Sequence, residues 1–452
     1  MDIDTPGGSS PVDLENLIQA YRGHSRINRL VFIAQASVGK PIELEALKLA
    51  ADDLKSTDSA VEMYELVMQM IDGRLGDAYI PDVAWIETTR RANREQEKKL
   101  KHELKQYQNN MMKESIRMAH NDLADFYYNR GGPDNLNEAF RSYVRTRDYC
   151  SSNRHTIAMC LNIVRVAIEV QNWVHVLNYA QKALQTPQND DVIVQAKLRA
   201  AEGLALMQMG KYLDAAHVLT SVSPEIGDTF SDVIAAQDIG VYGTLCALAS
   251  MPRTSLHRCV AESGPFRELV TIPDLREAVQ DFHAARYSGA LAALARLQPT
   301  LELDPHVSRH VRPLMAAIRS RALAQYCKPF AAADLRRMAQ VFGTTEDGLQ
   351  AELEALIEGG QIDARIDVAR GVLVERTRDD RAAAYEAALA GSDAMLGSTR
   401  ALLLRASLVR HDVSVKRPAR AGRGHGDGGT PGPPQHVDTE MEGPTGIAAA
   451  ME

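Results

Sequence analysis

Cysteine and aromatic residues are scarce in this chain of 452 residues. It has five cysteines, and phenylalanine, tryptophan and tyrosine together make up 5% of it. No two cysteines have CxxC spacing, so the sequence predicts neither a zinc knuckle nor a disulfide framework. Reduced thiols in a cytosolic or nuclear protein are the expected state of Cys150, Cys160, Cys246, Cys259 and Cys327.

Long apolar runs and a surplus of positive charge are also absent. The longest apolar runs, such as residues 30–34 and 401–404, are far shorter than the roughly 20 residues of a membrane-spanning helix. The N-terminus, MDIDTPGGSSPVD, lacks the basic start and apolar run of a secretory signal. The formal net charge of −8 gives no general attraction to nucleic acid or to an anionic membrane. We therefore expect a soluble intracellular protein with no membrane partner.

The motifs of common enzyme classes are missing. An HxH metalloprotease site needs two histidines separated by one residue, and the chain has no such pair. His102-Glu103 begins an HExxH pattern, but Gln106 stands where the second histidine is required. His306 and His310 are four residues apart and lack an evident third ligand, so they are weak evidence for a metal. We predict no catalytic residue, no cofactor and no metal site.

Helical periodicity dominates what is present. After a Gly-, Ser- and Pro-rich start at residues 1–11, which we expect to be disordered, apolar residues recur at three- and four-residue steps. Residues 12–110 are predicted to form an N-terminal helical region. Its charge-dense stretch at 88–107 is compatible with a phosphate-binding stripe, but the interleaved acids favour a solvated connecting helix.

Residues 111–300 have the pattern of paired helices. Breakers such as Gly131-Gly132-Pro133 and Gly210 separate amphipathic stretches into pairs at a spacing of roughly 35–40 residues, typical of tetratricopeptide-like repeats. The pairs are expected at 113–150, 155–185 and 192–222. Each pair buries only one face by itself, so consecutive pairs are expected to stack into a solenoid. An irregular helical bundle is the alternative, and either architecture offers an extended, non-catalytic surface.

The pattern changes in residues 301–378. A helix from about residue 310 to 327 is expected to hold Pro313 in its first turn, where proline is tolerated. Two short helices and two β-prone runs follow, at 334–342, 346–358, 362–366 and 372–374. This is the order of a winged helix. A two-stranded hairpin leaves an open edge, so we predict that Val372 and Val374 contact another subunit.

The second helix of the winged module argues against reading DNA. Residues 346–358 carry five carboxylates and neither lysine nor arginine. Carboxylates repel phosphates and release no counterions from the duplex, so we expect no specific nucleic-acid partner.

A long amphipathic helix is predicted for residues 379–412, and the Gly/Pro-rich tail at 413–452 is expected to be disordered. Leucines recur at near-heptad spacing along the helix, which is typical of a helix that joins a bundle. The residues predicted to contact partner subunits are Leu389, Leu396, Leu402, Leu403 and Val409, with Tyr385 and Met395 beside them.

A helical-repeat array followed by a winged helix and a terminal helix resembles the PCI family of scaffold subunits. Ordered segments narrow the resemblance to the subunit 1 family of the COP9 signalosome. They include RLVFIA at 29–34, AWIETTRR at 84–91, KESIRMAHNDLADFY at 113–127, QNWVHVLNYAQKA at 171–183 and VYGTLCALAS at 241–250. The segments cover about residues 12–412, and their number and order carry the resemblance.

The resemblance implies a non-catalytic scaffold in a complex that removes a ubiquitin-like modifier from cullins, a reaction that belongs to another, metalloprotease subunit. It implies partners as well: the other signalosome subunits, through PCI–PCI contacts and a helical bundle, and indirectly cullin-RING ubiquitin ligases. It further implies a nuclear and cytoplasmic location. A PCI scaffold subunit of the proteasome regulatory lid is the alternative.

Overall fold

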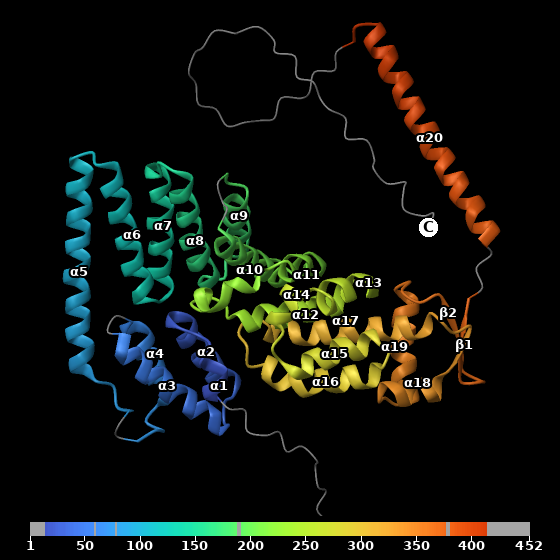
Figure 1. Ribbon diagram of the computed structural model, residues 1–452, viewed down its shortest axis with the longest axis horizontal. Helices are drawn as coiled ribbons and strands as arrows, with labels where there is room; N and C mark the ends of the chain where they lie inside the picture. The colour runs from blue at the N-terminus through green and yellow to red at the C-terminus, as the bar shows by residue number, and fades with distance from the viewer. Residues whose placement is uncertain (1–13, 58–59, 77–78, 188–190, 377–379, 414–452) are drawn as a thin grey trace, which may run out of the picture. The chain divides into compact units, whose positions relative to one another are not determined.

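The computed structural model describes residues 14–57, 60–76, 79–187, 191–376 and 380–413 (Figure 1). The chain divides into two compact units, Met1–Arg376 and Thr377–Glu452. As predicted, the fold is helical with one small β-sheet. No helix in the described ranges is long and apolar enough to cross a lipid bilayer. The disorder predicted for residues 1–11 and for the tail from residue 413 falls outside the described residues, apart from Val413.

The first four helices enclose a hydrophobic core of their own. Leu30, Leu47 and Tyr64 are completely buried in it, and the ring of Trp85 meets Tyr64 edge-on at a centroid distance of 4.9 Å. Pro41 is the first residue of its helix, where its missing N–H costs no hydrogen bond. The four helices are α1 (Leu14–Ile18), α2 (Gly23–Ala36), α3 (Pro41–Thr57) and α4 (Val61–Ile71).

The helix pairs expected in the middle of the chain are present and pack one after another (Figure 1). A long helix, α5 (Val83–Asn109), precedes them and buries Ile86, Thr89 and Leu104, as expected for a largely solvated connector. The pairs are α6 (Lys113–Arg130) with α7 (Pro133–Arg145), α8 (Asn153–Glu169) with α9 (Trp173–Leu184), and α10 (Val192–Gln208) with α11 (Tyr212–Thr220).

Several turns between neighbouring helices use one backbone arrangement. After α5, α8, α10 and α15 (Pro273–His283), one residue takes a left-handed conformation, and the next N–H donates to the carbonyl five residues back. This is the Schellman ending, which favours glycine at the left-handed position. The left-handed residues are Met111, Gln171, Gly210 and Ala285, with φ of 52°, 59°, 77° and 60°.

One helix, α12 (Ala236–Ser250), is buried on almost every side. Its glycines let neighbouring segments approach, and a Cβ added to Gly240 would lie 2.3 Å from the carbonyl oxygen of Leu269. It packs against α11, α14 (Gly264–Leu269), α15 and α17 (Ser308–Cys327). The same region contains α13 (Arg253–Leu256) and α16 (Tyr287–Leu301). Shorter turns are η2 (Thr146–Tyr149), η3 (Pro224–Phe230) and η4 (His257–Ala261).

Two features of this region differ from the sequence prediction. α16 was not predicted, although its buried residues Ala290, Ala293, Leu294, Leu297 and Leu301 recur at helical spacing. Pro313 is the sixth residue of α17, not a residue of its first turn, because the helix begins at Ser308. The carbonyl of Arg309 loses its helical N–H partner there, and since Arg309 is exposed, solvent can replace that bond.

The winged module has one more strand than predicted. β1 (Ala332–Asp334) precedes α18 (Leu335–Phe342) and α19 (Glu346–Glu358), and β2 (Ala364–Asp367) and β3 (Val372–Glu375) complete an antiparallel sheet. The strand order is β1-β3-β2, which makes β3 the central strand. The second unit contains α20 (Asp380–Arg410), close to the predicted terminal helix.

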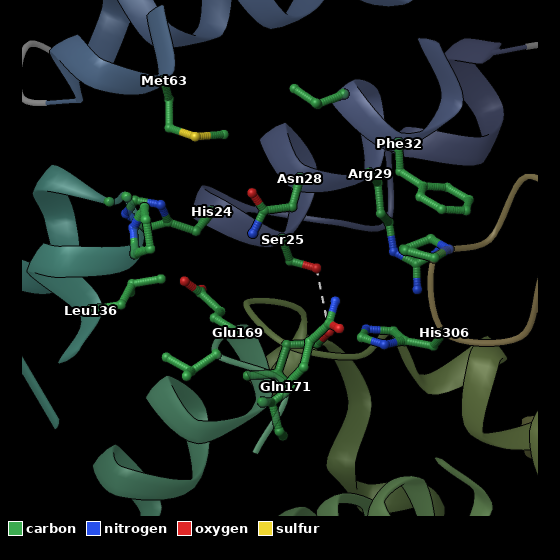
Figure 2. Close-up of a pocket in the computed structure, with 18 of the residues that line it drawn as sticks. His24, Ser25, Asn28, Arg29, Phe32, Met63, Leu136, Glu169, Gln171 and His306 are labelled. Carbon is green, nitrogen blue, oxygen red and sulfur yellow. Dashed lines mark hydrogen bonds between the residues drawn. The ribbon is translucent and has the colours of Figure 1, made fainter. Parts of the chain in front are cut away.

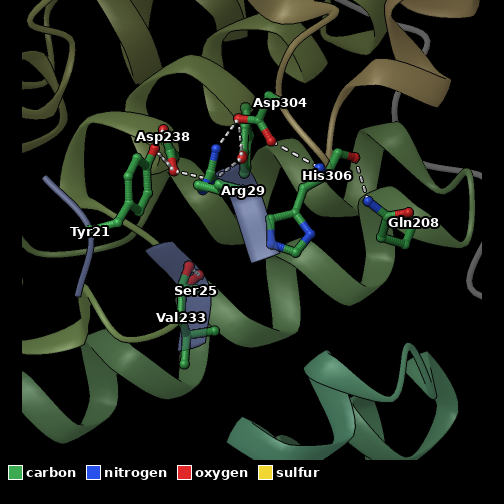
Figure 3. A network of polar contacts seen from close by, with 9 residues as sticks. Tyr21, Ser25, Arg29, Gln208, Val233, Asp238, Asp304 and His306 are labelled. Carbon is green, nitrogen blue, oxygen red and sulfur yellow. Dashed lines mark hydrogen bonds and ion pairs between the residues drawn. The ribbon is translucent and has the colours of Figure 1, made fainter. Parts of the chain in front are cut away.

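A buried guanidinium joins α2 to distant parts of its unit. Arg29 lies between Asp238 of α12 and Asp304, which precedes α17, with its nitrogens 2.8 and 3.1 Å from their carboxylate oxygens (Figure 3). Tyr21 donates to Asp238 at 2.6 Å, and its ring centroid lies 3.9 Å from the guanidinium carbon. Tyr242 donates to Asp304 at 2.7 Å. Each carboxylate therefore receives one charged and one neutral side-chain donor, and Asp304 also accepts a hydrogen bond from the backbone N–H of His306.

The electrostatics of this cluster depend on Arg29. Burial alone would lower the pKa of Arg29, but the charges of Asp304 and Asp238 outweigh burial and hold the pKa well above its ordinary value. Burial raises the pKa of Asp238 to about 6, against the opposing charge of Arg29. At Asp304 burial also acts to raise the pKa, but Arg29 and its other partners leave it below the ordinary value. Without Arg29, two carboxylates would be buried with no cation beside them.

We expect Ala285→Gly to stabilise the protein by about 1 kcal/mol, because glycine removes the steric strain of a left-handed alanine. The free energy of unfolding in urea measures this. Ala284→Gly is the matched control: its φ is −76°, so glycine there gains nothing and adds only backbone entropy to the unfolded chain. Equal destabilisation by both changes would contradict the strain at Ala285.

We expect Arg29→Met to destabilise the N-terminal helices by about 3–5 kcal/mol, because it leaves two buried carboxylates uncompensated. Urea unfolding is followed by the fluorescence of Trp85 in a Trp173→Phe background. Arg26→Met is the matched control on the same helix. Its ion pair with Asp53 is one-third exposed, with side-chain exposures of 35% and 32%, so its loss should cost about 1 kcal/mol or less. Similar losses in the two variants would rule out a stabilising role for the cluster.

Candidate assembly surfaces

The winged module is built by helix caps and a small apolar core. Asp334 accepts a hydrogen bond from the N–H of Arg336 at 2.9 Å and so starts α18, and Gly343 ends that helix in the left-handed conformation. Thr345 caps α19 through the N–H of Gly348 at 3.3 Å. The core beneath them consists of Leu335, Met338, Phe342, Leu349, Leu353, Leu356 and Leu373.

Side chains of α17 and α16 hold this module in place. Arg319 of α17 reaches Glu352 of α19 at 2.8 Å and the carbonyl oxygen of Phe342 at 3.3 Å. The ring of Tyr287, from α16, stacks on Phe342 at a centroid distance of 5.9 Å. The module is therefore packed onto the helices before it, and its sheet has a defined orientation within the first unit.

The predicted edge contact at Val372 and Val374 needs a correction. Both residues lie on β3, which pairs with β1 on one side and β2 on the other, so their strand is not an open edge. The open edges belong to β1 and β2. Val374 is nevertheless 41% exposed and Val372 is half-buried, while Leu373 between them faces the core. What these valines offer a partner is a side-chain face of the sheet, and their part in an interface stays a prediction.

The acidic character of α19 is retained in the structure. Glu346 pairs with Arg336 at 3.2 Å and Glu352 with Arg319, so two of its carboxylates serve ion pairs within the module. Asp347, Glu354 and Glu358 are exposed. The helix that would enter a DNA groove in a winged-helix reader thus presents negative charge.

The apolar side chains of α20 are exposed along its whole length. Leu389, Leu396 and Leu403 are 50%, 53% and 66% exposed. A Cβ added to Gly391 or Gly397 would meet nothing within 4 Å. Leu402 and Val409, which are also predicted to form an interface, are exposed as well, and so are Tyr385 and Met395 beside them.

The hydrogen bonds and pKa shifts of the described histidines and cysteines bear on metal binding and nucleophilic chemistry: His310 is engaged in hydrogen bonds, and three thiols have raised pKa values. The ring nitrogens of His310 are bonded to Tyr212 at 3.0 Å and to Gln208 at 3.2 Å, so this ring has no nitrogen left for a metal shared with His306. Burial raises the pKa of Cys246 to about 12 and that of Cys160 and Cys327 to about 11, which makes these thiols poor nucleophiles. Within the described ranges no group of three or more His, Cys, Asp or Glu side chains is placed to hold a metal ion.

Two family models match parts of the chain. Residues 82–258 match the family described as 26S proteasome subunit RPN7, and residues 291–376 match the PCI domain. The second match contains the winged module, and the first contains α5 and the helix pairs.

Whole-chain comparisons separate the two readings of the sequence. The 26S proteasome non-ATPase regulatory subunit 6 of Caenorhabditis elegans is 23% identical over 80% of this chain and 87% of its own length. COP9 signalosome complex subunit 1b of Drosophila melanogaster is 32% identical over 91% of this chain and 88% of its own. COP9 signalosome complex subunit 1 of Arabidopsis thaliana is 42% identical over 90% of this chain and 92% of its own. The chain belongs to the COP9 signalosome subunit 1 family.

Proposed function

We propose that this protein is a non-catalytic scaffold subunit of the COP9 signalosome that supports the removal of a ubiquitin-like modifier from cullins, and so regulates cullin-RING ubiquitin ligases. Membership of the COP9 signalosome subunit 1 family supports the assignment to this complex. The reaction of the complex is inferred from the resemblance. We further propose that the protein acts in the nucleus and the cytoplasm.

The exposed stripe of α20 is the observation that carries the scaffold role. Each leucine that leaves water on association contributes on the order of 2 kcal/mol. Several leucines in near-heptad spacing therefore provide a large gain on entering a bundle. Gly391 and Gly397 each lower helix propensity by roughly 1 kcal/mol relative to alanine. A helix of this kind gains most of its order from packing against partner helices.

The winged module supports a second contact with a neighbouring subunit. Its sheet is short, its outer face carries Val374, and its two edge strands have three and four residues. Short edge strands pair with an added strand only over a small length, so a neighbour would combine edge contacts with the side-chain face. Side-by-side packing of PCI modules fits this surface.

The absence of catalysis is proposed on the chemistry of the side chains. The buried thiols described above have raised pKa values, and both ring nitrogens of His310 are engaged in hydrogen bonds within the chain. The chain thus supplies positions for other subunits, and the isopeptidase chemistry is assigned to a different subunit of the complex.

Leu396→Asp with Leu403→Asp should abolish stable incorporation into the complex, because each aspartate places an unpaired charge in an apolar bundle. The measurement is affinity purification of the tagged full-length chain, with partner subunits quantified by mass spectrometry. The matched control is Ala394→Asp with Ala401→Asp, which adds the same charges at the same spacing on the opposite side of α20 and should leave incorporation near normal.

Normal co-purification of the leucine variant would show that the stripe is not the assembly surface. Recovery of proteasome ATPases with the unmodified chain, in place of signalosome subunits and a cullin, would instead favour the proteasome lid. The two results are independent, since one concerns the helix and the other the identity of the complex.

The purified chain alone should not cleave a modified cullin, and a chelator should have no effect on it. Metal analysis of the same sample should find no stoichiometric zinc. The assembled complex serves as the active control. Chelator-sensitive cleavage by the isolated chain, accompanied by one zinc per molecule, would refute the non-catalytic assignment.

A further inference from the structure

A groove lies where α2 faces the turns of two helix pairs and the segment before α17. Its volume is about 580 Å³, within the roughly 300–1,000 Å³ of typical ligand sites. Figure 2 shows His24, Asn28 and Phe32 on one side, with Glu169, Gln171 and His306 facing them. Its wall is partly apolar, through Phe32, Met63, Leu136 and Trp173.

Several polar groups in the groove have no partner within the described part of the chain. Arg29 is only 6% exposed, and its Nε is buried without an acceptor, although its other nitrogens bind Asp238 and Asp304. The side-chain amides of Asn28 and Gln171, which line the same groove, make no hydrogen bond to another described residue. A buried donor without an acceptor is costly, and this applies to Nε of Arg29. Asn28 and Gln171 are exposed, so their amides are free to bind the carbonyls and N–H groups of a ligand.

Gln171 occupies a strained position in this groove. Its φ is 59°, and the equivalent turns place Met111 and Ala285 in the same left-handed region, whereas the turn after α10 has Gly210 with φ of 77°. A non-glycine residue in the left-handed region costs roughly 1–2 kcal/mol. The glutamine side chain at this turn enters the groove, as Figure 2 shows, where a glycine would leave the turn relaxed and the groove without an amide.

One end of the groove holds two carboxylates, Glu169 and Asp232, that form no ion pair among the described residues. The carboxylate of Glu169 accepts a hydrogen bond from the neutral hydroxyl of Tyr128, and burial raises the pKa of Glu169 to about 7. The charge of Arg165 acts to lower this pKa, and that of Asp232 acts to raise it. Arg165 pairs with Asp125 instead, at 3.5 Å.

The histidines of the groove do not neutralise this end. Burial lowers the pKa of His24 to about 4, with Arg165 acting in the same direction. Burial also lowers the pKa of His306 to about 4, and Arg29 adds to that effect. Both rings are neutral at physiological pH, so neither adds positive charge beside Glu169 and Asp232. A cation placed there would favour the ionised form of Glu169, whereas a phosphate group would oppose it.

We propose that this groove binds an extended segment of a partner protein and places one lysine or arginine side chain of that segment against Glu169 and Asp232. The backbone of the segment would pair with the amides of Asn28 and Gln171 and with Nε of Arg29. Its neighbouring side chains would pack on Phe32 and Trp173. A peptide offers the alternating carbonyls, N–H groups and apolar side chains that this lining requires, whereas a nucleic acid brings phosphates to the carboxylates.

The test uses the full-length chain with the change Trp85→Phe. The sequence has two tryptophans, so this change leaves only Trp173, which lines the groove. The probe is a pool of acetylated, amidated octapeptides with arginine fixed at the fourth position and the other positions mixed. The matched pool has citrulline there, which keeps the shape and removes the charge. We expect a saturable change in Trp173 fluorescence with the arginine pool and at least about tenfold weaker binding of the citrulline pool.

Glu169→Gln and Asp232→Asn should each weaken binding of the arginine pool by about tenfold. Glu268→Gln, an exposed carboxylate outside the groove, is the matched control and should bind as the parent does. If circular dichroism shows that Glu169→Gln is misfolded, the exposed Asp232 decides the question. No fluorescence change up to about 1 mM peptide, equal binding of the citrulline pool, or equal weakening by Glu268→Gln would overturn the proposal. None of these results bears on assembly through α20.

Discussion

The first unit depends on one positive charge removed from water. Arg29 is held by carboxylates from positions 209 and 275 residues later in the chain, Asp238 and Asp304, and by the ring of Tyr21. Buried ion pairs contribute little net stability compared with apolar packing, but removing one partner is costly. Such a cluster therefore acts mainly on specificity: it admits one docking of α2 on α12 and the segment before α17, since any displacement leaves charges unpaired.

That docking also determines where the groove forms. Asp304 accepts a hydrogen bond from the backbone N–H of His306 at 2.8 Å, and the carbonyl of His306 accepts one from Gln208 (Figure 3). The same arginine that fixes α2 thus fixes the segment that forms the opposite wall. The guanidinium directs two nitrogens to the carboxylates, and its remaining Nε is buried without an acceptor. Arg29 thus belongs both to the structural cluster and to the lining of the groove for which binding is proposed.

Periodicity was sufficient to predict what depends on neighbouring residues. The helix pairs, the two helices of the winged module and the terminal helix lie close to where the apolar spacing placed them. The sequence could not reveal what depends on distant partners. Arg29 is the first residue of the segment RLVFIA, and no neighbouring residue in the sequence indicates that its charge pairs with Asp238. β1 has the sequence Ala-Ala-Asp, which has low strand propensity and becomes a strand because β3 offers it an edge. Because β1 was not predicted, β3 was expected to be an edge strand, whereas it is the central strand of the sheet.

The two units differ in how their interactions are completed, and this bears on function. In the first unit large apolar side chains are buried, and the charge of Arg29 is met by residues of the same chain. In α20 the large apolar side chains Leu389, Leu396 and Leu403 are exposed and two glycines lower the helix propensity, and these features support the proposal that the helix packs against partner subunits. Interactions completed within the first unit determine the shape of that unit. Under the proposed function, the exposed side chains of the second unit would bind partner subunits, so a change in α20 should alter assembly and leave the first unit folded.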